Sequence, residues 1–283
     1  MPEGPEAEIT ARALHTCLAG RTLAVTHLDG TRLADAADLD ATEVVSVHRA
    51  GKWVGFAHGT GTTWVHMGMS GRFVIARSTH RLDHARLALA TTDLGPVLYT
   101  TLIDPRRFSR AHTGPVPPGP ELGPDVLEDP QSAAGNLTGR RRGAKALLLD
   151  PSVIAGVGNY LADEALHRAG VHPAARHLDG PAASALASAA GDTARSSLAA
   201  GGMSMRDWAA PDGTRGRMLE RCSVFRRAPG PCPGCGTALR TARIASRTTT
   251  WCPRCQPVTA PGKAEDAPCW MWPPGDGRGR WVT

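Results

Sequence analysis

The chain has 283 residues, of which 41% are hydrophobic, so it can bury a substantial core and is not disordered throughout. It carries 32 Lys and Arg against 26 Asp and Glu, and this formal net charge of +6 suits a polyanionic partner without identifying one. No run approaches the ~20 apolar residues that span a bilayer, and the acidic N-terminus lacks the apolar core of a secretory leader. We therefore expect a cytoplasmic protein without membrane contact, whose seven cysteines are thiols or metal ligands rather than disulfides.

One amphipathic helix followed by many short strands is predicted for the N-terminal part. After the first six residues, Ile9, Ala13 and Cys17 recur at helical spacing. From about residue 21 to 112, short apolar runs alternate with Gly, Asp and Thr turns, which is typical of an antiparallel sandwich or barrel. The Gly-rich stretch 59–62 lacks the lysine of a phosphate-binding loop, so we interpret it as a hairpin turn.

The remaining chain divides by composition. A segment saturated with Pro and Gly separates the strand-rich part from an Ala- and Leu-rich part with helical stretches near 144–149, 159–169 and 181–200. A cysteine module and a Pro- and Gly-rich end with three tryptophans follow. The predicted units are a domain over residues 1–113, a linker over 114–124, a second domain over 125–221, the cysteine module over 222–256 and a flexible tail over 257–283.

Four cysteines form two knuckles. Cys232 and Cys235 are separated by two residues, and after sixteen further residues Cys252 and Cys255 repeat that spacing. Four thiolates so arranged can surround one Zn²⁺ tetrahedrally, so we predict one structural zinc ion; disulfides or a redox pair are the alternatives. The segment between the knuckles predicts a hairpin with Arg247 close to its turn, where the alternative is a solvated arginine.

A Gly-rich turn precedes the helix that begins near Asn159. Gly156 and Gly158 let backbone N–H groups approach a ligand closely, and the positive end of the helix lies at the same place. Lys145 and the arginines at 140–142 precede this turn and add charge. The pattern indicates a phosphate site, although an N-cap with a tight packing turn explains the same residues equally well.

Together these features resemble the formamidopyrimidine-DNA glycosylase/endonuclease VIII family, over residues 1 to about 255. The landmarks occur in the family order: Pro2-Glu3-x-Pro5-Glu6, Gly51-Lys52, His66 to Gly71, Asp104 to Phe108, Lys145, Ala155 to Asn159, and the cysteine hairpin with Arg247. The resemblance implies an α+β multidomain fold: an N-terminal antiparallel β-sandwich with flanking helices, then a helix-two-turn-helix domain with a β-hairpin zinc finger. It also implies a monomer that binds damaged double-stranded DNA in a basic cleft between the domains.

The same resemblance implies a catalytic set of Pro2, Glu3 and Lys52. Once Met1 is removed, Pro2 is a secondary amine, and an α-amino group has a pKa of about 8 against ~10.4 for lysine, so more of it is unprotonated at neutral pH. Glu3 is then the general acid/base, and an iminium with the sugar leads to β- and δ-elimination. Glu6 is either a supporting carboxylate or simply a cap of the first helix.

Further residues are implied to hold the DNA. Those expected to contact phosphates are Lys52, Lys145, Asn159 and Arg247. Those expected to fill the space left by the extruded base are Met69, Arg106 and Phe108. Taken in isolation, Met69 and Phe108 would be core residues, and we interpret His66 and His84 as structural.

The sequence gives mixed indications of which damaged bases are removed. The opening Pro-Glu-Gly-Pro-Glu and the run 158–161 resemble the branch that removes oxidised pyrimidines. The Met-Ser-Gly motif and the stretch 201–227, with Arg206 where a lysine is usual, resemble the branch that removes oxidised purines. We favour oxidised purines such as 8-oxoguanine and formamidopyrimidines; the alternatives are an enzyme for oxidised pyrimidines and a non-catalytic protein that binds damaged DNA.

Overall fold

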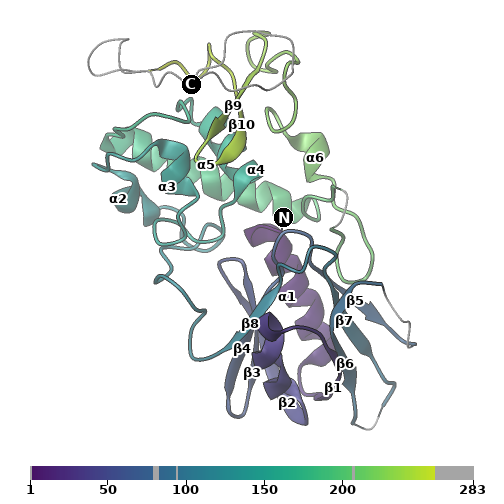
Figure 1. Cartoon of the computed structure of the whole chain (residues 1–283). Helices are drawn as coiled ribbons and strands as arrows, with labels where there is room; N and C mark the ends of the chain where they lie inside the picture. Colours follow the sequence, from purple (N-terminus) through teal and green to yellow (C-terminus); the bar gives the residue numbers. More distant parts are fainter. Residues whose placement is uncertain (1, 79–82, 94, 206–207, 259–283) are drawn as a thin grey trace.

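The computed structural model describes residues 2–78, 83–93, 95–205 and 208–258, so the predicted tail lies outside the described residues from residue 259 onward. Figure 1 shows two stacked lobes, a sheet lobe from the N-terminal part of the chain and a helical lobe that also carries a short hairpin. Each lobe has its own cluster of buried hydrophobic side chains, and a third, small cluster lies beside the cysteines. Within the described ranges, no helix is both long and apolar enough to cross a membrane.

The sheet lobe consists mainly of strands. Its helices are α1 (Gly4–Leu18) and the 3-10 helix η1 (Thr31–Leu39). Its strands are β1 (Thr22–Leu28), β2 (Thr42–Ala50), β3 (Trp53–His58), β4 (Gly61–His66), β5 (Arg72–Ala76), β6 (Ala85–Thr91), β7 (Tyr99–Ile103) and β8 (Arg110–Thr113). The hairpin turn predicted over residues 59–62 is confirmed, because it joins β3 to β4.

The strands form one antiparallel sheet in the order β5-β7-β6-β1-β2-β3-β4-β8. β1 and β2 pair at only two positions, starting with Thr22 opposite Glu43, so the sheet folds over there into two four-stranded halves. The rings of Phe56 on β3 and Phe73 on β5, with centroids 6.0 Å apart, bring the halves into contact. The predicted antiparallel β-sandwich is therefore confirmed.

Helix α1 closes the core of the sheet lobe. Its buried face carries Ala7, Ala11, Leu14 and Leu18, each at most 2% exposed. The helix begins at Gly4, earlier than the apolar spacing predicts, because Pro5 is tolerated in a first turn where no intrahelical N–H bond is lost. Glu3 thus stands directly at the start of the helix.

The helical lobe confirms the predicted helical stretches and adds two short helices. Its helices are α2 (Ala133–Leu137), α3 (Ala144–Leu148), α4 (Asn159–Arg168), α5 (Gly180–Ala199) and α6 (Met218–Arg221). Strands β9 (Arg240–Ile244) and β10 (Arg247–Trp251) form the hairpin, which lies against α4 in Figure 1. Ala245 and Ser246 make its turn with φ values of 50° and 59°.

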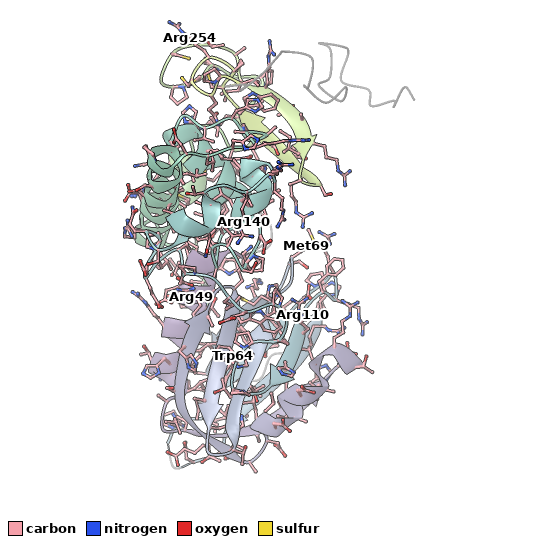
Figure 2. The ribbon with its side chains drawn as sticks, turned by 90° about the vertical axis from the view of Figure 1, so that its left-hand side faces the viewer. Arg49, Trp64, Met69, Arg110, Arg140 and Arg254 are labelled. Carbon is pink, nitrogen blue, oxygen red and sulfur yellow. The ribbon has the colours of Figure 1, made fainter. Side chains whose placement is uncertain are left out.

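Buried polar contacts join the two lobes. Arg49 on β2, whose side chain is 1% exposed, donates hydrogen bonds to Glu8 on α1 (2.9 Å) and to Asp125 of the helical lobe (2.7 Å). Figure 2 shows Arg49 where the lobes meet. The backbone N–H of Gly4 also donates to the carbonyl of Gly156 at 2.8 Å. The N-terminus of the chain is therefore fixed against the helical lobe.

Candidate active site and DNA interface

Pro2 and Glu3 lie buried at the junction of the lobes, with Glu3 only 2% exposed. The Glu3 carboxylate accepts hydrogen bonds from the backbone N–H groups of Gly158 (2.8 Å), Tyr160 (3.0 Å) and Leu161 (3.2 Å) at the start of α4. A helix N-terminus favours a negative charge at this place. A Cβ at residue 158 would lie 2.3 Å from Glu3 Cδ, so this close approach requires glycine there.

The environment of Glu3 favours its protonated form. The pKa of Glu3 is raised to about 7, mainly by burial: the charge of Lys52 and the backbone N–H donors lower this pKa, and Glu6 raises it. Near neutral pH the group is thus divided between acid and carboxylate. A positioned group with such a pKa can donate a proton and later accept one.

Glu6 is a second buried carboxylate, one helical turn from Glu3 and 1% exposed. It accepts hydrogen bonds from the backbone N–H groups of Glu3 (2.7 Å) and Met203 (2.8 Å) and from the hydroxyl of Tyr160 (2.8 Å). Burial raises the pKa of Glu6, and these donors act against the rise. The carboxylate therefore connects α1 with α4 and with the segment after α5.

Lys52 lies in the turn between β2 and β3 and faces the same site. Burial lowers the pKa of Lys52; Glu3 and Glu6 act in the opposite direction, and the charge of Arg247 lowers it further. Lys52 comes from the sheet lobe and Arg247 from the hairpin of the helical lobe. The structure therefore brings the predicted catalytic residues Pro2, Glu3 and Lys52 together and places Arg247 within electrostatic range of them.

His66, interpreted from the sequence as structural, lies within electrostatic range of Lys52. Its Nδ1 accepts a hydrogen bond from the backbone N–H of Gly68 (3.0 Å), so in the neutral ring Nε2 bears the hydrogen. Burial, Arg110 and Lys52 together lower its pKa to about 3, which keeps the ring neutral. The position of His66 within the motif of residues 66–71 was the sequence feature that could have placed it near Lys52. His84, by contrast, supports the backbone: its carbonyl accepts from the N–H of residue 104.

Two loops bring Met69, Arg106 and Phe108 together at the edge of the sheet lobe. The Asp104 carboxylate joins the loops, because it accepts from the hydroxyl of Ser70 (2.5 Å) and from the backbone N–H of Arg106 (3.2 Å). The Arg106 guanidinium lies 5.0 Å from the centroid of the Phe108 ring. Met69, labelled in Figure 2, is 43% exposed and Phe108 is 39% exposed. These side chains are therefore not core residues.

Lys145 points away from solvent. Its side chain is 0% exposed, and Nζ donates to Asp163 (2.6 Å), to the hydroxyl of Thr249 (2.7 Å) and to the carbonyl of Thr248 (3.3 Å). The ammonium group has three hydrogens, and all three are used. In this arrangement Lys145 links the hairpin to α3 and α4 by hydrogen bonds. A phosphate contact by Lys145 stays a prediction.

The side chain of Asn159 also binds the hairpin, whereas Arg247 is exposed. The Asn159 side-chain amide donates to the carbonyl of Thr248 at 3.0 Å. Arg247 directly precedes Thr248 in the hairpin, and its guanidinium donates to the carbonyl of Ser246 (3.2 Å). The hydrogen bonds of Lys145 and Asn159 therefore hold β10 in place, and Arg247 extends from this strand toward the catalytic residues.

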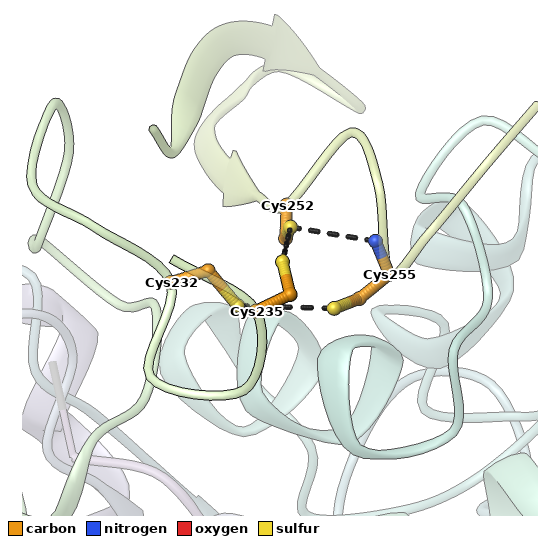
Figure 3. Close-up of side chains that lie close together, drawn as sticks. All are labelled: Cys232, Cys235, Cys252 and Cys255. Carbon is orange, nitrogen blue, oxygen red and sulfur yellow. Dashed lines mark hydrogen bonds between the residues drawn. The ribbon is translucent and has the colours of Figure 1, made fainter. Parts of the chain in front are cut away.

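The four cysteines of the knuckles form one cluster, with all four Sγ atoms within 4.8 Å of one another (Figure 3). Nε2 of His167 on α4 lies 3.3 Å from Cys232 Sγ. Four thiolates this close repel one another unless a cation lies between them, and a tetrahedral all-sulfur donor set suits zinc. Cys232, Cys235, Cys252 and Cys255 therefore hold one structural zinc ion, as the sequence predicted.

Fold and site together define a class of protein. The buried acid Glu3 lies beside Pro2, at the helix N-terminus of a helix-two-turn-helix domain, and a zinc hairpin packs against that domain. This combination is that of a zinc-containing DNA glycosylase of base excision repair.

Comparison with known proteins gives the family. Three family models match: the formamidopyrimidine-DNA glycosylase N-terminal domain over residues 1–111, the formamidopyrimidine-DNA glycosylase H2TH domain over 122–208, and the zinc finger found in FPG and IleRS over 230–258. The formamidopyrimidine-DNA glycosylase of Alkalilimnicola ehrlichii is 35% identical over 90% of this chain and 100% of its own length. That of Halorhodospira halophila is 38% identical, with the same coverage.

Solved structures agree with this assignment. The crystal structure of the MutM (Fpg) protein from Thermus thermophilus is 35% identical, with a TM-score of 0.78 over 90% of this chain and 98% of that one. Lactococcus lactis Fpg, solved with DNA that contains an abasic site, shares the fold at 22% identity with a TM-score of 0.77. The chain belongs to the formamidopyrimidine-DNA glycosylase family.

Proposed function

We propose that this enzyme removes oxidised purines, including 8-oxoguanine and formamidopyrimidines, from double-stranded DNA and then cuts the strand at the resulting site. The observation that carries the proposal is Glu3, a buried acid with a pKa of about 7 next to Pro2. A group that is half protonated near neutral pH can protonate a departing base and can afterwards remove a proton.

In the first step, the secondary amine of Pro2, freed by removal of Met1, attacks C1′ of the damaged nucleotide. The bond from nitrogen to C1′ forms, the glycosidic bond breaks, and the departing base takes the bonding electrons together with a proton. Glu3 supplies the proton that the base takes; it then receives the proton that the Pro2 nitrogen loses and passes it to O4′, so that the C1′–O4′ bond breaks and the sugar ring opens. The charge of Lys52 opposes the negative charge that Glu3 then carries. The product is an iminium between Pro2 and the sugar.

In the second step, the iminium makes the C2′ proton acidic. Loss of that proton expels the 3′ phosphate by β-elimination, and a further elimination expels the 5′ phosphate. Lys52 and Arg247, which face the catalytic group from opposite lobes, are suited to hold the departing phosphates. His66 offers a neutral N–H donor beside them.

The base must leave the duplex before it can reach Pro2, at a cost of about a few kcal/mol. The exposed group of Met69, Arg106 and Phe108 is suited to fill the space it leaves, with Arg106 free to hydrogen-bond the unpaired opposite base. Lys145 and Asn159 act through the hairpin that carries Arg247.

Excision of oxidised pyrimidines is the second candidate. The observation that favours it is Tyr160, which, with its neighbours at 158–161, resembles the endonuclease VIII branch and contacts both buried carboxylates. The predicted loop residue Arg206, which bears on this choice, lies outside the described residues.

We also propose that the enzyme acts as a monomer in the cytoplasm and that residues 1–113, 125–221 and 222–256 are its folding units, joined by the linker 114–124. The absence of a membrane-spanning helix in the described ranges and the separate buried clusters of the two lobes support this view. Sedimentation equilibrium at micromolar concentration should return a mass near 29.7 kDa.

The chemistry is tested by borohydride trapping. The enzyme is mixed with duplexes that carry 8-oxoguanine, an oxidised pyrimidine or an abasic site, and sodium borohydride is added. We expect a stable enzyme–DNA adduct, strongest with 8-oxoguanine among the damaged bases. Pro2→Gly should cut the strand more weakly with lesion binding retained, because glycine supplies a primary amine in place of the secondary amine of proline. No adduct with any duplex, or an adduct from a protein whose mass includes Met1, would overturn the mechanism; a stronger reaction with the pyrimidine lesion would favour the second candidate.

A further inference from the structure

One residue contacts both buried carboxylates of the active site. The backbone N–H of Tyr160 donates to Oε1 of Glu3 at 3.0 Å, and its hydroxyl donates to Oε1 of Glu6 at 2.8 Å. Tyr160 itself is 2% exposed and belongs to the first turn of α4. The same residue thus lies against the proposed general acid and against the carboxylate next to it.

The phenol differs from the other close donors to Glu6. Glu6 also accepts from the backbone N–H groups of Glu3 and Met203, and these are set by the chain path whatever the side chains are. The hydroxyl of Ser197 lies farther away, at 3.5 Å, and 2.9 Å from the hydroxyl of Tyr160. The phenol is therefore the close donor to Glu6 that a substitution can remove.

Three donors on one carboxylate favour its ionised form, because each bond is stronger to a charged acceptor. A negative charge on Glu6 in turn favours a protonated Glu3, since two buried carboxylates one helical turn apart resist being charged together. Other charged or titratable groups interact with this pair from the surrounding elements: Lys52 from the β2–β3 turn, Lys145 from α3 and Cys222 after α6. Arg247 from β10 acts on the two lysines. The lysines act against the effect of Glu6 on Glu3.

We propose that Tyr160 is a positioning residue whose hydroxyl keeps Glu6 ionised, so that Glu6 holds Glu3 in the protonated form that base release requires. The inference rests on the proposed function, because it assigns a role to Tyr160 in the protonation of that acid. Tyr160 acts only through Glu6 and touches neither the base nor the sugar.

The test is the pH profile of base release by Tyr160→Phe under single-turnover conditions, on a duplex with 8-oxoguanine. Removal of the hydroxyl should let Glu6 become neutral more readily, so Glu3 loses its proton at lower pH. We expect base release to be about tenfold slower than wild type at pH 8 but only about twofold slower at pH 6, since general-acid catalysis follows the protonated fraction. Strand cutting at a preformed abasic site needs no base release and should change less at both pH values.

Two further variants separate this role from a structural one. Glu6→Gln removes the charge directly, so it should shift the profile in the same direction, and adding Tyr160→Phe to it should produce no further shift. Thr193→Val removes another buried hydroxyl from α5, one that donates to the carbonyl of Ala189, and should keep the wild-type profile.

The outcomes are distinguishable. A Tyr160→Phe profile that superimposes on wild type, an equal loss at both pH values, or a second shift in the Glu6→Gln background would each overturn the inference while leaving the proposed function intact. If Tyr160→Phe does not fold, the shift in Glu6→Gln alone decides, and its absence overturns the inference. Failure of the wild-type enzyme to release any base would overturn the proposed function and, with it, this role of Tyr160.

Discussion

The two groups of residues at the proposed DNA site are held in opposite ways. Glu3 and Glu6 are at most 2% exposed, and several donors fix each carboxylate. Met69 and Phe108 are 43% and 39% exposed, and the fold covers neither. A buried charge is costly unless it is bonded, whereas apolar side chains exposed together beside the Arg106 guanidinium are available for contact with DNA. The first group should therefore govern reaction rate, and the second group should govern DNA affinity.

Glu3→Gln should have the largest effect and separates reaction rate from DNA affinity. The amide cannot supply the proton, so base release from an 8-oxoguanine duplex should fall about 10²–10⁴-fold, the usual contribution of general acid–base catalysis. Affinity for the same duplex should change little, because Glu3 is buried inside the protein. Single-turnover rates and titration of binding measure the two effects separately. Base release at the wild-type rate would remove Glu3 from its role.

The next largest effect is expected at Lys145, which is also buried but acts on the hairpin. Lys145→Ala leaves Asp163 without its cation, which should destabilise the protein by about 3–5 kcal/mol in denaturant unfolding. DNA affinity should fall with it, because the hairpin that carries Arg247 loosens. The double variant Lys145→Met, Asp163→Leu removes both charges and should recover most of the stability.

This experiment also decides between two roles of Lys145. A direct phosphate contact, as the sequence implied, would reduce the slope of log affinity against log salt by about one with little change in stability. If Lys145→Ala keeps the stability of wild type but reduces the slope of log affinity against log salt, Lys145 does not act by holding the hairpin in place.

The zinc site and the main helices can be predicted from the sequence because they depend on local spacing. The pairs Cys232 with Cys235 and Cys252 with Cys255 specify a tetrahedral donor set whatever the rest of the fold does. The helix α5 likewise follows from an Ala-rich run, with Gly191 in its middle, that ends at a glycine pair. Elements whose evidence lies within a few residues can be predicted from a single chain.

Contacts between distant segments could not be predicted in the same way. The donors to Glu3 lie 155 to 158 residues away in the chain, and the partner of Lys145 in the hairpin lies 104 residues away. A lysine near a Gly-rich turn resembles a phosphate ligand in the sequence, and only the packed structure shows that its ammonium faces Asp163. The identity of these residues was visible in the sequence, whereas their burial was not.

The smallest effect is expected in the exposed group, at Phe108. Phe108→Ala removes an exposed ring that lies beside the Arg106 guanidinium, so base-stacking area is lost while the protein core is untouched. Loss of one aromatic–base stack costs about 1–3 kcal/mol, and we therefore expect affinity for a duplex with an abasic site to fall about tenfold. Stability should stay within about 0.5 kcal/mol of wild type, as for most surface substitutions.

A matched control is Val45→Ala on β2, where an apolar side chain is 64% exposed outside the loops that carry Met69 and Phe108. It should leave DNA affinity unchanged. With saturating enzyme, Phe108→Ala should release a flipped base at nearly the wild-type rate, because Glu3 and its donors are unaltered. If the rate falls while the affinity holds, the division between a buried group that sets rate and an exposed group that sets affinity is wrong. Phe108 would then have to act on the extruded nucleotide itself.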